Sequence, residues 1–132
     1  MPTKNLLVRN KFLLGIAIGW TALIGVLCLV KSGDLPSLHI SGTDKYVHFT
    51  FHFIFTLLWA TYASQKQKEH KIKNSLKVVG YSLLYGILIE FLQETLTTTR
   101  HADILDVLAN LTGALTAFLV FVMLKAAITK NT

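Results

Sequence analysis

The sequence predicts an all-α membrane protein, a bundle of four transmembrane helices with both termini on the cytoplasmic side. Three observations support this prediction. The 132-residue chain is 52% hydrophobic and only 15% charged, and its mean hydropathy of +0.52 is high for a soluble domain of this length. Four stretches approach or exceed the roughly 18 apolar residues that cross a bilayer as a helix. The basic residues also fall almost entirely on one side of these stretches.

The first two predicted spans are nearly free of polar side chains. Residues 12–30 contain no charged residue, and residues 46–63 contain none when their two histidines are neutral. A basic start followed by an apolar run also resembles a signal peptide. However, the run is long and is not followed by a small-residue cleavage pattern. We therefore interpret residues 12–30 as a retained helix of a single-domain chain.

The third and fourth predicted spans carry polar residues in the part of each helix nearest the connection between them. This placement puts the polar chemistry in one outer third of the membrane rather than at its centre. The polar positions are Glu90, Gln93 and Glu94 in residues 78–96, and Asp106 and Asn110 in residues 104–124.

The distribution of lysine and arginine predicts the orientation, because positively charged loops are retained in the cytoplasm. Ten of the 13 basic residues lie in the N-terminal segment, in the loop between the second and third spans, and in the C-terminal tail. Six of the seven acidic residues lie on the opposite side. The formal net charge of +6 is thus explained by topology, and the basic loop lacks the interleaved aromatic residues of a nucleic-acid surface. We expect no nucleic-acid partner.

The polar residues of the last three spans are predicted to meet in one pocket. Residues three or four apart share a helix face, which gives each of these helices one polar stripe. His52, Glu90 and Asn110 each lie about 9 Å from the outer ends of their helices. An ionised side chain facing lipid costs on the order of 2.5–3.5 kcal/mol, so the stripes should turn inward. We expect Glu90, Asp106 and His48 to be the catalytic candidates, and the remaining pocket residues to be Asp44, Lys45, His52, Gln93, Glu94, Arg100, Asp103 and Asn110.

Several of these residues also have simpler interpretations. Asp44 and Asp103 stand at predicted helix starts, where capping and the helix dipole favour an aspartate. His48 and His52 have the spacing of a helical metal-binding pair, to which a carboxylate could add a third ligand. Histidines also serve as buried hydrogen-bonding groups between membrane helices, and this interpretation is preferred. The sequence assigns no metal ligand, no cofactor and no oligomeric state.

The order of these residues resembles the VanZ-like family of small bacterial membrane proteins. The match runs over about residues 44–117: DKYVH at 44–48, then a Glu-x-x-Gln, an arginine, and a downstream Asp and Asn before a small-residue stripe. Two positions depart from the family pattern: His52 stands where an aromatic residue is frequent, and Ala117 replaces a frequent glycine. The family takes its name from a protein associated with resistance to the glycopeptide antibiotic teicoplanin, so the resemblance suggests a link to that resistance.

The predicted function is recognition, by this outward-facing pocket, of an envelope lipid, a lipid-linked cell-wall precursor or a lipid-like glycopeptide antibiotic. Two alternatives stay open: an intramembrane acid–base enzyme acting on a lipid head group at the outer leaflet, and a structural subunit of an envelope complex. The expected partner is therefore a membrane lipid or a lipid-linked cell-wall component. The expected location is the bacterial cytoplasmic membrane, which the chain crosses several times.

Overall fold

The structure, a computed structural model of the whole chain, describes residues 2–30, 42–66, 71–96 and 101–130. Within these ranges the chain is helical, with no strand, which confirms the predicted all-α class. Each helix contains its predicted span, apart from one residue at the end of the first, and three of the four extend well beyond it. The helices are α1 (Pro2–Leu29), α2 (Thr43–Lys66), α3 (Lys71–Leu96) and α4 (Ile104–Lys130).

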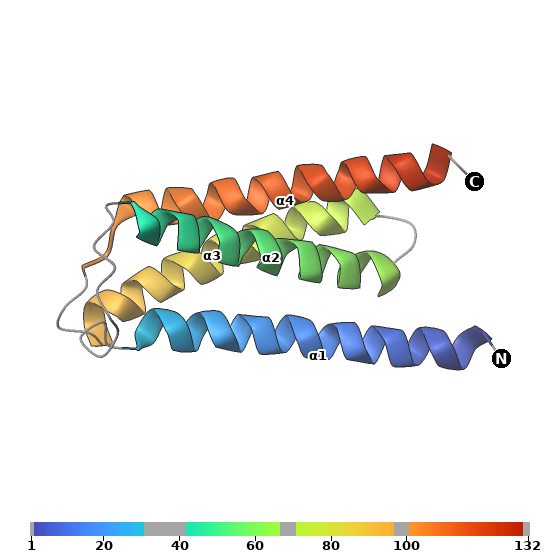
Figure 1. Cartoon of the computed structure of the whole chain (residues 1–132), viewed down its shortest axis with the longest axis horizontal. Coiled ribbons are helices and arrows are strands. Elements are labelled where there is room, and N and C mark those ends of the chain that lie inside the picture. The colour runs from blue at the N-terminus through green and yellow to red at the C-terminus, as the bar shows by residue number, and fades with distance from the viewer. Residues whose placement is uncertain (1, 31–41, 67–70, 97–100, 131–132) are drawn as a thin grey trace.

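Successive helices run in opposite directions (Figure 1). The start of α1, the end of α2, the start of α3 and the end of α4 therefore lie together at one end of the bundle. The helices α2 and α3 lie between α1 and α4. In the described part of the chain, α2 packs against all three other helices and most extensively against α4, whereas α1 and α4 do not touch.

Three helices are long and apolar enough to cross a membrane: α1 over Val8–Leu29, α3 over Ile72–Leu96 and α4 over Ile104–Ile128. The helix α2 is not among them, because its histidines and threonines lower its mean hydropathy. Its position accounts for this composition. Over its described length, the large apolar residues that α2 exposes are only Tyr46 and Val47, whereas α1, α3 and α4 each expose many. The helix with the most polar interior surface is the one most enclosed by its neighbours.

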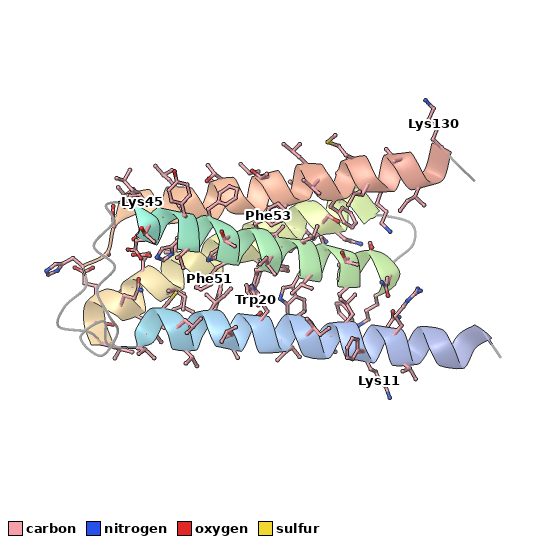
Figure 2. The ribbon with its side chains drawn as sticks, in the orientation of Figure 1. Lys11, Trp20, Lys45, Phe51, Phe53 and Lys130 are labelled. Carbon is pink, nitrogen blue, oxygen red and sulfur yellow. The ribbon has the colours of Figure 1, made fainter. Side chains whose placement is uncertain are left out.

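The apolar core holds α1 against α2 and α3. Buried Ile24, Cys28, Phe55 and Ile89 pack together, with partly buried aromatic rings around them. The rings of Trp20 in α1 and Phe51 in α2 pack edge to face, with their centroids 5.9 Å apart. Both side chains lie between the two helices in Figure 2. The indole Nε1 of Trp20 also donates a hydrogen bond of 3.1 Å to the carbonyl of that phenylalanine. Aromatic packing and interhelical hydrogen bonds thus replace the hydrophobic driving force that is absent between helices in lipid.

Two glycines allow α4 to approach its neighbours closely. A Cβ atom at Gly113 would overlap the backbone carbonyl of Phe49 in α2, so these two helices touch backbone to backbone. A Cβ atom at Gly86 of α3 would lie 2.6 Å from the amide nitrogen of Asn110. Both contacts lie beside the polar residues of the bundle. The absence of a side chain at these glycines is what lets polar groups of three helices come together.

Candidate functional site

A lysine ties the start of α2 to the start of α4. The ammonium Nζ of Lys45 lies 3.0 Å from Oδ2 of Asp103 and 3.2 Å from Oδ1 of Asp106. Asp103 also caps α4, because its Oδ1 accepts a hydrogen bond of 2.8 Å from the backbone N–H of Leu105. That bond, helped by Lys45, lowers the pKa of Asp103. Asp103 therefore stays charged near neutral pH.

His48 is 2% exposed and lies at the centre of a polar cluster. The cluster consists of Asp44, Lys45, His48, Glu90, Asp103, Asp106 and Asn110. The Nδ1 atom of His48 is 3.2 Å from Oδ1 of Asn110, a carbonyl oxygen that can only accept, so Nδ1 carries the proton. Its Nε2 faces carboxylate oxygens from three helices: Oδ2 of Asp106 at 3.7 Å, Oε1 of Glu90 at 3.8 Å and Oδ1 of Asp44 at 3.9 Å. The three catalytic candidates of the sequence therefore lie side by side.

Glu90 and Asn110 are buried more completely than their polarity would favour. Oε2 of Glu90 accepts a hydrogen bond of 3.2 Å from the backbone N–H of Asp103, which joins α3 to the start of α4. Its other oxygen, Oε1, is buried without a hydrogen-bond partner, and so is the amide nitrogen Nδ2 of Asn110. Burying such groups without partners costs about 1–3 kcal/mol each. Two such unsatisfied atoms therefore lie within the polar residues that join α2, α3 and α4.

His52 lies one helical turn further along α2 from His48 and has a different role. It is 1% exposed, and its Nδ1 is 2.8 Å from the hydroxyl oxygen of Ser82 in α3. Ser82 was not among the residues identified from the sequence. Its spacing of four residues before Gly86 and eight before Glu90 places it on the polar face of α3 and was the signal that could have identified it.

The other predicted pocket residues differ in where they lie. Gln93 is buried, but its Nε2 donates a hydrogen bond of 2.8 Å to the carbonyl of Cys28 in α1, and so fastens α3 to α1. Glu94 is exposed on the outside of α3 and does not share the buried position of Glu90. Arg100 lies outside the described residues.

The described cluster carries more negative than positive formal charge. Four carboxylates, those of Asp44, Glu90, Asp103 and Asp106, face a single lysine and one histidine. Lys45 lies at the end of the bundle opposite Lys11 and Lys130 (Figure 2). Such a cluster can accept hydrogen bonds from hydroxyl and amine groups, and its side chains include ligands for a cation. Ligand atoms of Asp44, His48 and Asp106 all lie within 4.8 Å of one another.

Comparison with known proteins gives one finding. The family model described as VanZ/LLP1 matches residues 30–125, which is more than half of the chain and includes the whole polar cluster. A search of curated proteins and a search of solved structures each found no match.

Proposed function

Because the chain belongs to the VanZ/LLP1 family, we propose that it is a four-span protein of the bacterial cytoplasmic membrane whose polar cluster faces outward and recognises the head group of an envelope amphiphile. The amphiphile is an envelope lipid, a lipid-linked cell-wall precursor or a lipid-like glycopeptide antibiotic such as teicoplanin. One observation carries this proposal: the buried side chains of His48, Glu90, Asp106 and Asn110, from α2, α3 and α4, converge near one end of the helix bundle.

The proposed fourth span is α2. A helix of 24 residues is about 36 Å long, which exceeds the hydrocarbon thickness of roughly 30 Å. The side chains of His48 and His52 are buried against α3 and α4, so the energetic objection to polar groups in lipid does not apply to them.

The proposed orientation places the cluster on the outer side of the membrane. Nine of the ten basic residues that the structure describes lie near the start of α1, the end of α2, the start of α3 or the end of α4, at the end of the bundle opposite the cluster. Retention of basic segments in the cytoplasm then puts both termini inside the cell. Resistance to teicoplanin would follow if the cluster captured the antibiotic before it reached its target.

The charge of the cluster indicates which head groups it suits. Carboxylate oxygens of Asp44, Glu90 and Asp106 offer acceptors, and Lys45 is already engaged by two aspartates. Hydroxyl-rich and amine-bearing head groups, such as those of sugars and amino sugars, are therefore favoured. The acyl chains of the amphiphile would lie along the exposed apolar side chains of α1, α3 and α4.

A binding experiment with teicoplanin as the probe tests this proposal. The purified chain is placed in lipid nanodiscs, and affinity is measured for the native sequence, for Glu90→Gln and for Glu94→Gln. Glu90→Gln removes the buried charge, whereas Glu94→Gln makes the same chemical change at an exposed position one turn along α3. We expect Glu90→Gln to weaken binding about tenfold or more, because a hydrogen bond to a charged group contributes ~1.5–3 kcal/mol. Equal affinities for the two variants would contradict the proposal.

A second candidate function is acid–base catalysis on a lipid head group. The observation that favours it is the unpartnered Oε1 of Glu90 beside the imidazole of His48, 3.8 Å away, with Asp106 adjacent. Such a carboxylate can act as a general base when a substrate hydroxyl or water reaches it. Mass spectrometry of envelope lipids incubated with the native protein and with Glu90→Gln would separate turnover from binding. Identical lipid profiles with both proteins would exclude this candidate.

A further inference from the structure

The contacts of His48 Nε2 have an unusual geometry. Three carboxylate oxygens lie 3.7–3.9 Å from this nitrogen, which is close enough for a strong electrostatic interaction. A direct N–H···O hydrogen bond needs about 2.7–3.2 Å, so none of the three is close enough to make one. Ligand atoms of Asp44, His48 and Asp106 also all lie within 4.8 Å of one another.

The other ring nitrogen fixes the tautomer of His48. Because Nδ1 donates its proton to Oδ1 of Asn110, a neutral imidazole directs the lone pair of Nε2 towards the three carboxylates. A lone pair facing three negative groups is repelled by them. A cation bound between these groups reverses the sign of every one of these interactions. Donation of the second ring N–H to a side-chain carbonyl is also the usual arrangement of a metal-ligating histidine.

Glu90 supplies an independent observation. Its side chain is 5% exposed, and its Oε1 is buried with no hydrogen-bond partner while lying 3.8 Å from Nε2 of His48. Asp106 divides its two oxygens in a compatible way: Oδ1 lies 3.2 Å from Lys45, and Oδ2 faces the imidazole. Each of these two acids therefore keeps one oxygen within 4 Å of Nε2 of His48.

We propose that His48, Asp44, Asp106 and Glu90 form a binding site for one divalent first-row transition-metal cation. One imidazole nitrogen with several carboxylate oxygens is a donor set that suits Zn²⁺, Mn²⁺, Fe²⁺ or Co²⁺ better than Cu⁺ or Ca²⁺. A tetrahedral ion with bonds of ~2.1 Å needs donor atoms about 3.4 Å apart. The nitrogen of His48 lies 3.7–3.9 Å from the three oxygens, and the ligand atoms of Asp44, His48 and Asp106 lie within 4.8 Å of one another, so the side chains must move inward to bind such an ion.

The site also has an entrance. The side chain of Asp44 is 52% exposed at the end of the bundle, whereas those of His48, Glu90 and Asp106 are at least nine-tenths buried. A cation can therefore be captured first by Asp44 and then by the inner ligands. The ion would offset the excess negative charge of the cluster. Metal binding itself does not depend on the proposed function.

Metal loading of the full-length, untagged protein in detergent tests the inference without any lipid or antibiotic. The protein is stripped with a chelator, loaded with Zn²⁺, dialysed and assayed for bound zinc by mass spectrometry, and Co²⁺ serves as a probe of the ligands by visible absorption. We expect one ion per chain. His48→Gln should abolish stoichiometric binding, whereas His52→Gln, which alters a buried histidine four residues further along the same helix, should retain it.

A variant at the exposed edge of the site separates loss of metal binding from loss of folding. Asp44→Asn changes an exposed side chain, so the bundle should stay intact, and circular dichroism verifies this for every variant. We expect Asp44→Asn to weaken Zn²⁺ binding about tenfold or more, because loss even of groups that only orient metal ligands weakens affinity 10–100-fold. The inference is overturned if the native chain retains no zinc, or if His48→Gln and Asp44→Asn both bind it as tightly as His52→Gln.

Discussion

Replacement of Gly113 by alanine should separate α2 from α4 and disturb the polar cluster with them. The added Cβ atom would overlap the carbonyl oxygen of Phe49 and lie 3.0 Å from the carbonyl carbon. These are backbone atoms of a packed helix, so they cannot rotate away as a side chain would. The two helices must move apart by about 1 Å to restore ordinary van der Waals contact.

The magnitude follows from what that displacement breaks. Overpacking of a tightly packed contact costs roughly 1–3 kcal/mol. A shift of about 1 Å also lengthens the 3.2 Å contact between His48 and Asn110 beyond hydrogen-bond range, since both are carried by the separating helices. We expect the melting temperature of Gly113→Ala to fall by roughly 5–10 °C, on the per-residue thermodynamics of a chain this size.

Thermal unfolding in detergent, followed by circular dichroism, measures this effect. Gly80→Ala in α3 is the matched control, because a Cβ atom there meets nothing within 4 Å. Alanine is a better helix former than glycine by about 0.8–1.0 kcal/mol, so the control should melt at or above the native temperature. The reasoning is refuted if Gly113→Ala melts as high as Gly80→Ala.

The remaining predictions concern two of the polar contacts. Ser82→Ala removes the 2.8 Å partner of buried His52 and should destabilise the bundle by about 1–3 kcal/mol, and an unchanged melting temperature would contradict this. Lys45→Gln leaves two carboxylates of α4 without their cation and should lower the melting temperature in detergent more than Lys73→Gln, an equivalent change at an exposed position of α3. An equal response of these two lysine variants would show that the ion pair does not hold α2 to α4.

The convergence of polar residues was predictable because energetic exclusion from lipid is strong and acts on every helix. The stripes placed His52, Glu90 and Asn110 at similar depths, whereas the structure puts His48 beside Glu90 and Asn110 and pairs His52 with Ser82. The all-α class followed from the lengths of the apolar stretches alone. The first prediction depended on helical periodicity and the second on apolar length, and a single sequence records both directly.

The partners of individual residues could not be predicted in the same way. A polar stripe shows which side chains share one face of a helix. It does not show which neighbouring helix the residues on either edge of that face contact. Gln93 and Glu94 flank the row of Glu90 on opposite sides, and only Gln93 turns inward, where it contacts α1. The rotation of α3 that selects between them is set by close contacts such as Gly86 against Asn110, which involve residues far apart in the sequence.

The enclosed position of α2 could not be predicted from its own sequence either. Its hydropathy is lower than that of α1, α3 and α4, and this composition is explained only once those helices are seen to surround it.

The central claim is that the polar cluster opens to the outside of the cytoplasmic membrane, and thiol labelling in intact cells tests it most directly. Single cysteines are introduced at exposed Ala102, beside the cluster, and at exposed Lys73, at the opposite end of the bundle, while native Cys28 is buried. A membrane-impermeant maleimide should label Ala102→Cys in intact cells, and Lys73→Cys only after the cells are permeabilised. Labelling of Lys73→Cys in intact cells, with Ala102→Cys protected until permeabilisation, would contradict the account.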